Sequence, residues 1–238
     1  MLAGHSEISK NLRKLGFACV AFEINLGAQY NLLRRDIGKL IRTWLGGGQV
    51  LGVWLGTPCT SWSIACRPAL RDKQNIWGFA EVPEHRRDTL VLGNRTLRFS
   101  CSIIRICIRN RIPCILENPD SSLMFHSPPM IALRRSPAAT EARLCMCKFG
   151  TPWRKATRLV GWHVNLNSFS NSMCHGRKGV CEFSNRHHIV LQGRDPNSGR
   201  TWTSLAGAYP ARFARAAALS LAEQNNKTQQ ALSMLIAS

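Results

Sequence analysis

A cysteine and a glutamate, each following a short apolar run, are the residues in this sequence best suited to chemistry. Cys59 follows the apolar residues 50–55 and the turn Gly56-Thr57-Pro58, whose proline fixes the local backbone. Glu117 ends a second apolar run at residues 112–116. A cysteine held in this way is a candidate nucleophile, and a nearby carboxylate is a candidate acid or base. The alternative for Cys59 is a buried structural thiol, because free cysteine is among the most buried residue types.

Both apolar runs predict short buried strands, because each is bounded by glycine or proline and is too short for a helix. In an open α/β sheet the carboxyl ends of parallel strands lie at one edge, where the loops that follow them form ligand sites. We therefore expect Cys59 and Glu117 to lie at the same edge of one sheet and to face a common cleft.

Residues 2–24 predict a glycine turn, an amphipathic helix and a strand that carries an acid at its end. Ile8, Leu12 and Leu15 recur at helical spacing, and residues 17–24 form an apolar run that includes Glu23. This order is typical of a nucleoside-binding half-fold, in which the acid accepts hydrogen bonds from ribose hydroxyls. The alternative for Glu23 is an exposed acid at the end of a strand.

Composition indicates one globular α/β domain with a polyanionic partner. The 238 residues are 45% hydrophobic, and 32 Lys and Arg against 13 Asp and Glu give a formal charge of +19. This imbalance favours nucleic acid over a membrane surface, and a merely solvated basic surface is the alternative. Ten scattered cysteines do not form the dense spacing of a secreted disulfide scaffold, and no apolar stretch is long enough to span a membrane. We therefore expect an intracellular protein, nuclear in a eukaryote or cytoplasmic in a bacterium or phage.

Two motifs carry a resemblance to a known family. Gly-Thr-Pro-Cys-Thr-Ser-Trp-Ser at 56–63 and Leu-Glu-Asn-Pro at 116–119 resemble the cytosine carbon-5 DNA methyltransferase family. Phe-Gly-Thr-Pro-Trp-Arg-Lys at 149–155 resembles a block of a divergent, phage-like or mobile-element-like branch of that family. The resemblance implies an α/β fold: a Rossmann-like S-adenosylmethionine-dependent methyltransferase sheet with helices on both faces and a small irregular recognition insert. It divides the chain into a catalytic core at 1–164, the insert at 165–200, a returning C-terminal helix at 201–224 and a frayed tail at 225–238.

The resemblance also implies catalytic roles. Cys59 would add to carbon 6 of a flipped cytosine, Glu117 would hydrogen-bond the ring nitrogen and the amine, and Arg154 would steady the carbonyl side.

S-adenosylmethionine is the cofactor that the resemblance implies. The family's opening Phe-x-Gly-x-Gly turn is reduced here to one glycine, Gly4, with serine in place of the second. An acid near Asp36 contacts the adenine end in the family, although Asp36 is equally suited to cap a helix. The implied cofactor-binding residues are Gly4, Glu23, Asp36 and Pro58.

Several residues are candidates for contact with nucleic acid. Residues 66–95 are polar and without a steady period, which indicates either a mobile active-site loop or disorder. Basic side chains in this loop, at 154–155 and in the insert suit phosphate and groove contacts. The predicted nucleic-acid-binding residues are Ser61, Arg67, Arg71, Lys155, Arg177 and Arg186.

A metal site is a further hypothesis for the insert. Cys174, Cys181 and His187 offer three ligands that suit zinc, although their spacing is looser than that of paired Cys-x-x-Cys knuckles. The alternative is a recognition loop whose cysteines are reduced and unliganded.

Two other functions stay open at this point. The same family includes an enzyme that methylates transfer RNA, and a short insert fits a small RNA target. A chain with an incomplete glycine turn is also compatible with a nucleic-acid-binding remnant of a mobile element that has lost catalysis.

Overall fold

The fold is built on a four-stranded mixed sheet with the strand order β1-β2-β4-β3. The computed structural model describes residues 7–23 and 27–237, with side chains up to Gln224. β1 and β2 are parallel, whereas β4 is antiparallel to both of its neighbours, β2 and β3. The strand bounds are Val53–Gly56 (β1), Cys114–Pro119 (β2), Ala139–Cys145 (β3) and Ala156–Trp162 (β4). The predicted α/β class is confirmed.

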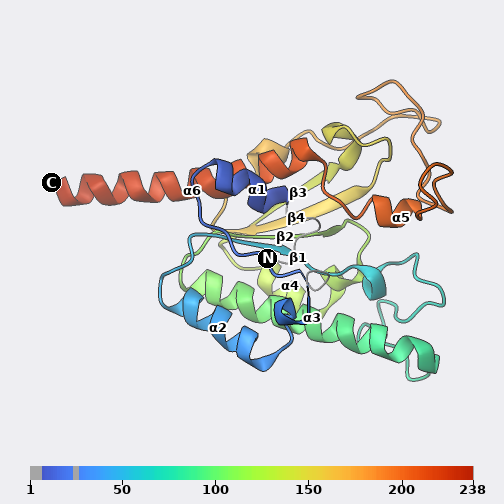
Figure 1. Cartoon of the computed structure of the whole chain (residues 1–238), viewed down its shortest axis with the longest axis horizontal. Coiled ribbons are helices and arrows are strands. Elements are labelled where there is room, and N and C mark those ends of the chain that lie inside the picture. Colours follow the sequence, from blue (N-terminus) through green and yellow to red (C-terminus); the bar gives the residue numbers. More distant parts are fainter. Residues whose placement is uncertain (1–6, 24–26, 238) are drawn as a thin grey trace.

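Helices cover both faces of this sheet (Figure 1). On one face lie α1 (Glu7–Lys14) and α6 (Ala211–Ala237), and on the other lie α2 (Arg35–Gly46), α3 (Glu84–Arg109) and α4 (Pro128–Arg134). A short helix, α5 (Trp202–Leu205), precedes α6. Within the described ranges, no helix combines the length and the hydropathy needed to cross a membrane.

Local sequence explains where several helices begin and end. α1 has an acid, Glu7, in its first turn and Lys14 in its last, which complements the helix dipole. Gly16 follows it with a φ of 88°, a conformation that favours glycine. α4 begins at Pro128, where the missing N–H costs no helical hydrogen bond.

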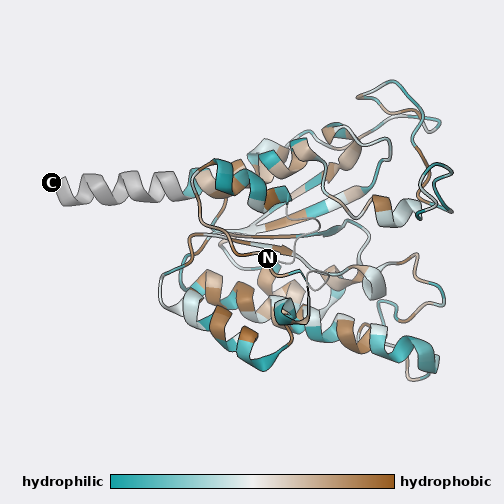
Figure 2. Ribbon diagram, viewed as in Figure 1, coloured by the Kyte–Doolittle hydropathy of each residue, from teal (hydrophilic) through white to brown (hydrophobic). Residues whose placement is uncertain are grey.

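Alternation along β2 divides the core between the two faces. Ile115 packs with Trp54 on the α6 side, whereas Cys114 and Leu116 pack on the α3 side. Because successive strand residues point to opposite faces, Glu117 lies on the same side as Ile115. The strand therefore directs the Glu117 side chain toward the start of α6. Figure 2 shows the largely hydrophobic centre of the sheet and the hydrophilic loops of the insert at residues 165–200.

The predicted strand at 17–24 is not formed in the described part of this stretch. Among residues 17–23 only Phe22 takes part in a β-bridge, and residues 1–6 and 24–26 lie outside the described ranges. A cavity of about 510 Å³, lined by Phe17, Val20 and Phe22 on one side and by Trp54 and Leu55 on the other, lies between this segment and the sheet. Within the described ranges the segment forms no strand beside β1, which lies at the edge of the four-stranded sheet.

Two helices are longer than expected. α3 begins at Glu84, within the stretch 66–95 that we expected to be a mobile loop or disordered, and α6 continues to Ala237 through the stretch that we expected to fray. The loop between β1 and α3 is correspondingly shorter than predicted.

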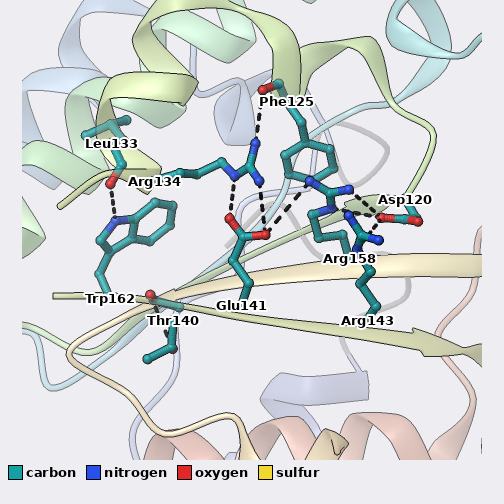
Figure 3. Close-up of polar contacts among 10 residues, drawn as sticks. Asp120, Phe125, Leu133, Arg134, Thr140, Glu141, Arg143, Arg158 and Trp162 are labelled. Atoms are coloured by element: carbon teal, nitrogen blue, oxygen red, sulfur yellow. Dashed lines mark hydrogen bonds and ion pairs between the residues drawn. The ribbon is translucent and has the colours of Figure 1, made fainter. Parts of the chain in front are cut away.

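An ion-pair network fixes the turn that follows β2 (Figure 3). Arg158 of β4 donates to Asp120 over 2.8 Å, and Arg143 of β3 lies 3.4 Å from the same carboxylate oxygen. Arg134 of α4 pairs with Glu141 of β3. The network joins three elements around the end of β2 and so holds the strand that carries Glu117.

Candidate active site

The carboxyl ends of β1 and β2 place Cys59 beside the strand that carries Glu117. Gly56 and Glu117 are register partners, and Cys59 follows Gly56 by three residues. The amide of Asn118 donates to the carbonyl oxygen of Thr57 over 2.6 Å, which joins the two strand ends directly. The two predicted strands are thus parallel neighbours, as the sequence indicated.

Glu117 is a buried carboxylate with one oxygen held and one oxygen unpaired. Its side chain is buried, with 6% of the residue exposed, and Oε2 accepts a hydrogen bond from the Tyr209 hydroxyl over 2.7 Å. That hydroxyl in turn accepts from Nε1 of Trp54 over 3.3 Å. Oε1 of Glu117 and Oδ1 of Asn118 are buried and, within the described residues, have no donor. Buried acceptors normally have donors, so two unpaired oxygens at one strand end favour a ligand that carries N–H groups.

The thiol of Cys59 is electrostatically coupled to Glu117 and Lys155. Burial raises the pKa of Cys59, the ammonium of Lys155 lowers it, and the carboxylate of Glu117 raises it. The Lys155 ammonium donates to the carbonyl oxygen of Ala206 over 2.8 Å, which fixes its position near the start of α6. The structure therefore gathers a thiol, a carboxylate and an ammonium at one edge of the sheet.

Arg154, the predicted third catalytic residue, lies elsewhere. Its guanidinium is exposed and hydrogen-bonds the thiol of Cys145, an interaction that raises the pKa of Arg154. The cation that acts on Cys59 is the neighbouring Lys155, which we had assigned to nucleic-acid contact. Arg154 and Lys155 are adjacent in the loop before β4, but their side chains bind different groups, Cys145 and the carbonyl oxygen of Ala206 respectively.

Two predicted nucleic-acid contacts are corrected, because Ser61 and Arg71 are buried. The Arg71 guanidinium donates to the carbonyl oxygens of Ser61 and Ile76 over 2.9 Å each and to Oδ1 of Asn94 over 2.8 Å. It also stacks on the ring of Trp62, 3.5 Å from the centroid. Burial lowers the pKa of Arg71 to about 10, so it stays charged at neutral pH. The buried Arg71 guanidinium therefore holds the loop after Cys59 together through its hydrogen bonds to Ser61, Ile76 and Asn94.

The remaining basic candidates are on the surface. Arg67 lies in the loop after Cys59, and Arg177 and Arg186 lie in the insert; all three side chains are exposed. They are therefore accessible to a polyanion.

The predicted cofactor residues do not gather into one pocket. Gly4 lies outside the described residues, and Glu23 is half-buried beyond the cavity along β1 without lining it. Asp36 is exposed in the first turn of α2 and pairs with Arg34 over 2.6 Å, and the N-cap is Arg34 itself. Pro58 is exposed. In the described ranges these residues do not form a site that fits S-adenosylmethionine.

A second group of residues could hold a metal ion. Cys147, Cys174, Cys181 and His188, named here the cysteine–histidine cluster, place four ligand atoms within 4.8 Å of one another. All three cysteines are buried. Burial raises the pKa of Cys147. Burial also acts to raise the pKa of Cys181, but hydrogen bonds from Ser184 and other neighbours lower it to about 6. Of these two ligands Cys181 therefore ionises more readily to the thiolate that binds metals.

The cluster confirms part of the predicted ligand set and corrects the rest. Cys174 and Cys181 belong to it, but His187 is exposed and its neighbour His188 takes the ligand position. Val180 and His187 form an isolated antiparallel bridge, and in such extended backbone His188 turns to the opposite side. Cys147 was missed because it comes from a distant part of the sequence.

Sequence reasoning also missed the hydrogen-bond donor of Glu117. Tyr209 is one of only two tyrosines in the chain and directly precedes the proline before α6. A tyrosine just before a helix-starting proline indicates that its side chain is held near the start of that helix. The sequence does not show which strand the helix packs against, so the contact with Glu117 could not be predicted.

Comparison with known proteins adds no relative to this description. No protein-family model matches the sequence, and neither the curated proteins nor the solved structures include a significant match.

Proposed function

We propose that the protein is a cytosine carbon-5 methyltransferase that acts on nucleic acid, with a sheet of the Rossmann-like S-adenosylmethionine-dependent type. One observation carries this proposal: Cys59 lies at the end of β1 beside Glu117, a buried carboxylate that keeps one oxygen free. The order of motifs that resembles the methyltransferase family supports it independently.

The unpaired oxygen of Glu117 suits the edge of a cytosine. A cytosine protonated at its ring nitrogen presents two adjacent N–H donors, the ring N–H and the amine. Among the described residues, Oε1 of Glu117 is a buried acceptor without a donor, and Oε2 is held by Tyr209. Uracil presents a carbonyl oxygen where cytosine has its amine, so that oxygen would face the carboxylate without a donor between them, at a cost of about 1–3 kcal/mol.

The covalent step follows from this arrangement. The thiolate sulfur of Cys59 adds to carbon 6, and the electron pair of the 5,6 double bond moves onto carbon 5 and the ring. The ring nitrogen takes up a proton from solvent, and Oε1 of Glu117 accepts a hydrogen bond from it, so the charge that develops on the ring is neutralised. Lys155 stabilises the thiolate against the effects of burial and of Glu117. S-adenosylmethionine, if bound beside this edge, would supply the methyl group to carbon 5 and leave as S-adenosylhomocysteine. Loss of the carbon-5 proton would then restore the 5,6 double bond and break the bond to the sulfur of Cys59.

Nucleic acid is the proposed substrate because the protein is strongly basic and several of its arginine side chains are exposed. The formal charge of +19 and the exposed Arg67, Arg177 and Arg186 favour contact with phosphates, which releases counterions. A cytosine in a duplex must be flipped out to reach Cys59, at a cost of a few kcal/mol. Duplex DNA is our first choice of substrate and transfer RNA the second.

We propose zinc as the ion of the cysteine–histidine cluster. Three cysteines and one histidine are a donor set of structural zinc sites, which are tetrahedral and closed. Bond lengths of about 2.3 Å to sulfur and about 2.0 Å to nitrogen put ligand atoms about 3.6 Å apart in a tetrahedron. Sγ of Cys174 and Nε2 of His188 are 3.8 Å apart.

Covalent trapping tests the proposed function. Wild-type protein is incubated with labelled S-adenosylmethionine and an oligonucleotide that contains 5-fluorocytosine, as duplex DNA or as a transfer RNA transcript. We expect a denaturation-stable adduct with one of them and none with Cys59→Ser. Cys19→Ser is the matched control, because Cys19 is the other half-exposed cysteine.

Failure of the wild type to form an adduct with either substrate overturns the proposal. If the same protein still retains nucleic acid, the function that remains is that of a non-catalytic binding protein. The scattered positions of Glu23, Asp36 and Pro58 favour that second candidate.

A further inference from the structure

The cysteine–histidine cluster joins two parts of the chain. Cys147 belongs to the loop of residues 146–155 that connects β3 to β4, whereas the other ligands, Cys174, Cys181 and His188, come from the insert. A metal ion at this position would tie the loop to the insert.

Hydrogen bonds next to two ligands hold the last residues of that loop. The backbone N–H of Met146 donates to the carbonyl oxygens of Arg154 and Lys155, over 3.0 and 3.2 Å. The N–H of Ile189 donates to the carbonyl oxygen of Pro152 over 2.8 Å. Met146 adjoins one ligand and Ile189 another, so fixing the ligands also fixes residues 152–155.

Lys155 depends on this support. Its φ of 23° is a strained value for a residue other than glycine, and such conformations persist only when the surrounding structure holds them. From this position its ammonium reaches the carbonyl oxygen of Ala206 and acts on the thiol of Cys59. A change in the loop would therefore reach the nucleophile through Lys155.

Arg154 complements the charge of a filled cluster. Three thiolates around a divalent ion leave one net negative charge. The guanidinium of Arg154 hydrogen-bonds Cys145, which lies two residues before the ligand Cys147. Of the two adjacent cations, Arg154 thus lies on the side of the metal ligands, and Lys155 acts on the nucleophile Cys59.

We infer that the metal ion in the cysteine–histidine cluster is a positioning device, which fixes the loop of residues 146–155 and so holds the Lys155 ammonium at the carbonyl oxygen of Ala206, at the edge of the sheet that carries Cys59. This inference rests on the proposed role of Cys59 as nucleophile. The metal ion takes no part in the covalent step. It holds Lys155 in place, so the effect of Lys155 on Cys59 depends on the metal ion.

The test measures metal content and the reactivity of Cys59 in the same samples. Zinc per chain is determined by mass spectrometry, and the rate of iodoacetamide labelling of the Cys59 peptide is followed from pH 6 to 10. The samples are wild type, Cys174→Ser, His188→Asn and wild type treated with a chelator and then reloaded with zinc. His187→Asn is the matched control. Lys155→Met gives the largest fall in Cys59 labelling that loss of the Lys155 ammonium can cause.

We expect about one zinc per chain in the wild type and in His187→Asn, and loss of zinc in Cys174→Ser and His188→Asn. In the zinc-free samples Cys59 labelling at pH 7 should fall by about threefold or more, because a higher pKa leaves less thiolate. Lys155→Met should give a similar fall with its zinc retained. Amide hydrogen exchange at Met146 should become faster without zinc, while exchange in β2 stays slow and shows that the sheet is folded.

Two results would overturn the inference. One is a wild type that binds no zinc. The other is a zinc-free protein with a folded sheet in which the pH profile of Cys59 labelling is unchanged. Neither result depends on methyl transfer, so a failure here and a failure of the trapping experiment are separate outcomes.

Discussion

The Tyr209 hydroxyl donates a hydrogen bond to Glu117 from a position 92 residues further along the chain. It also accepts one from Trp54, so a single buried hydroxyl joins β1, β2 and the segment that leads into α6. Because this bond occupies Oε2 of Glu117, the carboxylate is oriented with Oε1 free. The position of Tyr209, just before α6, therefore determines which oxygen of Glu117 stays available to bind a ligand.

Tyr209→Phe should destabilise the protein by about 1.5–3 kcal/mol, because it removes a buried hydrogen bond to a carboxylate and leaves the Trp54 N–H without its acceptor. Urea unfolding followed by circular dichroism measures the change. Tyr30→Phe, at the other tyrosine, is the control and should stay within about 0.5 kcal/mol of wild type. Equal stability of the two variants would show that the buried bond contributes nothing.

The pH dependence of Cys59 reactivity should move in opposite directions in two variants. Glu117 raises the pKa of Cys59, so Glu117→Gln should shift the midpoint of thiol labelling to lower pH. Lys155 lowers that pKa, so Lys155→Met should shift the midpoint to higher pH. In the wild type, burial places the midpoint above the ordinary thiol value of 9.0, and labelling should still be rising there. Shifts of the same sign in both variants would contradict the arrangement described here.

Arg71→Met should cost about 3–5 kcal/mol of unfolding free energy, because it leaves the buried carbonyl oxygens of Ser61 and Ile76 without their donor. Hydrogen exchange at residues 61–79 should become faster, whereas exchange in β2 should not. Arg67→Met, at an exposed arginine of the same loop, is the control and should change stability by less than about 0.5 kcal/mol. An Arg71 variant as stable as this control would rule out a structural role for the guanidinium.

Asp120→Asn should destabilise the protein by about 3–5 kcal/mol, because the side chain of Arg158 is largely buried and would lose its close ion pair. Asp36→Asn removes an exposed pair with Arg34 and should cost less than about 1 kcal/mol. Thermal unfolding at low and high salt distinguishes the two, since only the exposed pair is screened. The assignment fails if both variants respond to salt equally.

The sequence was sufficient to place the two strands that carry the candidate nucleophile and acid. Apolar runs ending in proline-containing turns predicted β1 and β2 as neighbours with their ends together, and the parallel register of Gly56 with Glu117 agrees. The run at 17–24 has the same apolar character, yet in its described part only Phe22 takes part in a β-bridge and no strand forms. Local pattern reports that a segment is extended and buried, but pairing also requires a partner edge within hydrogen-bonding distance.

The errors in the candidate site have a common physical origin. Arg71 was assigned to phosphate contact because it lies in the polar loop after Cys59, and only the three-dimensional loop shows the carbonyl groups that its guanidinium binds. Tyr209 reaches Glu117 across a distance in sequence that no local pattern encodes. The choice between His187 and His188 depended on which side of an extended segment faces the buried thiols, and the sequence alone does not specify that direction.

The unpaired Oε1 of Glu117 at the end of β2 also determines how the protein responds to small fragments. A buried acceptor without a donor lowers the free energy of unfolding by about 1–3 kcal/mol. A small heterocycle that offers one N–H group to this oxygen relieves that cost while touching little else. Its isostere without the N–H group does not, so the melting temperature of this protein discriminates between two fragments that differ by one donor.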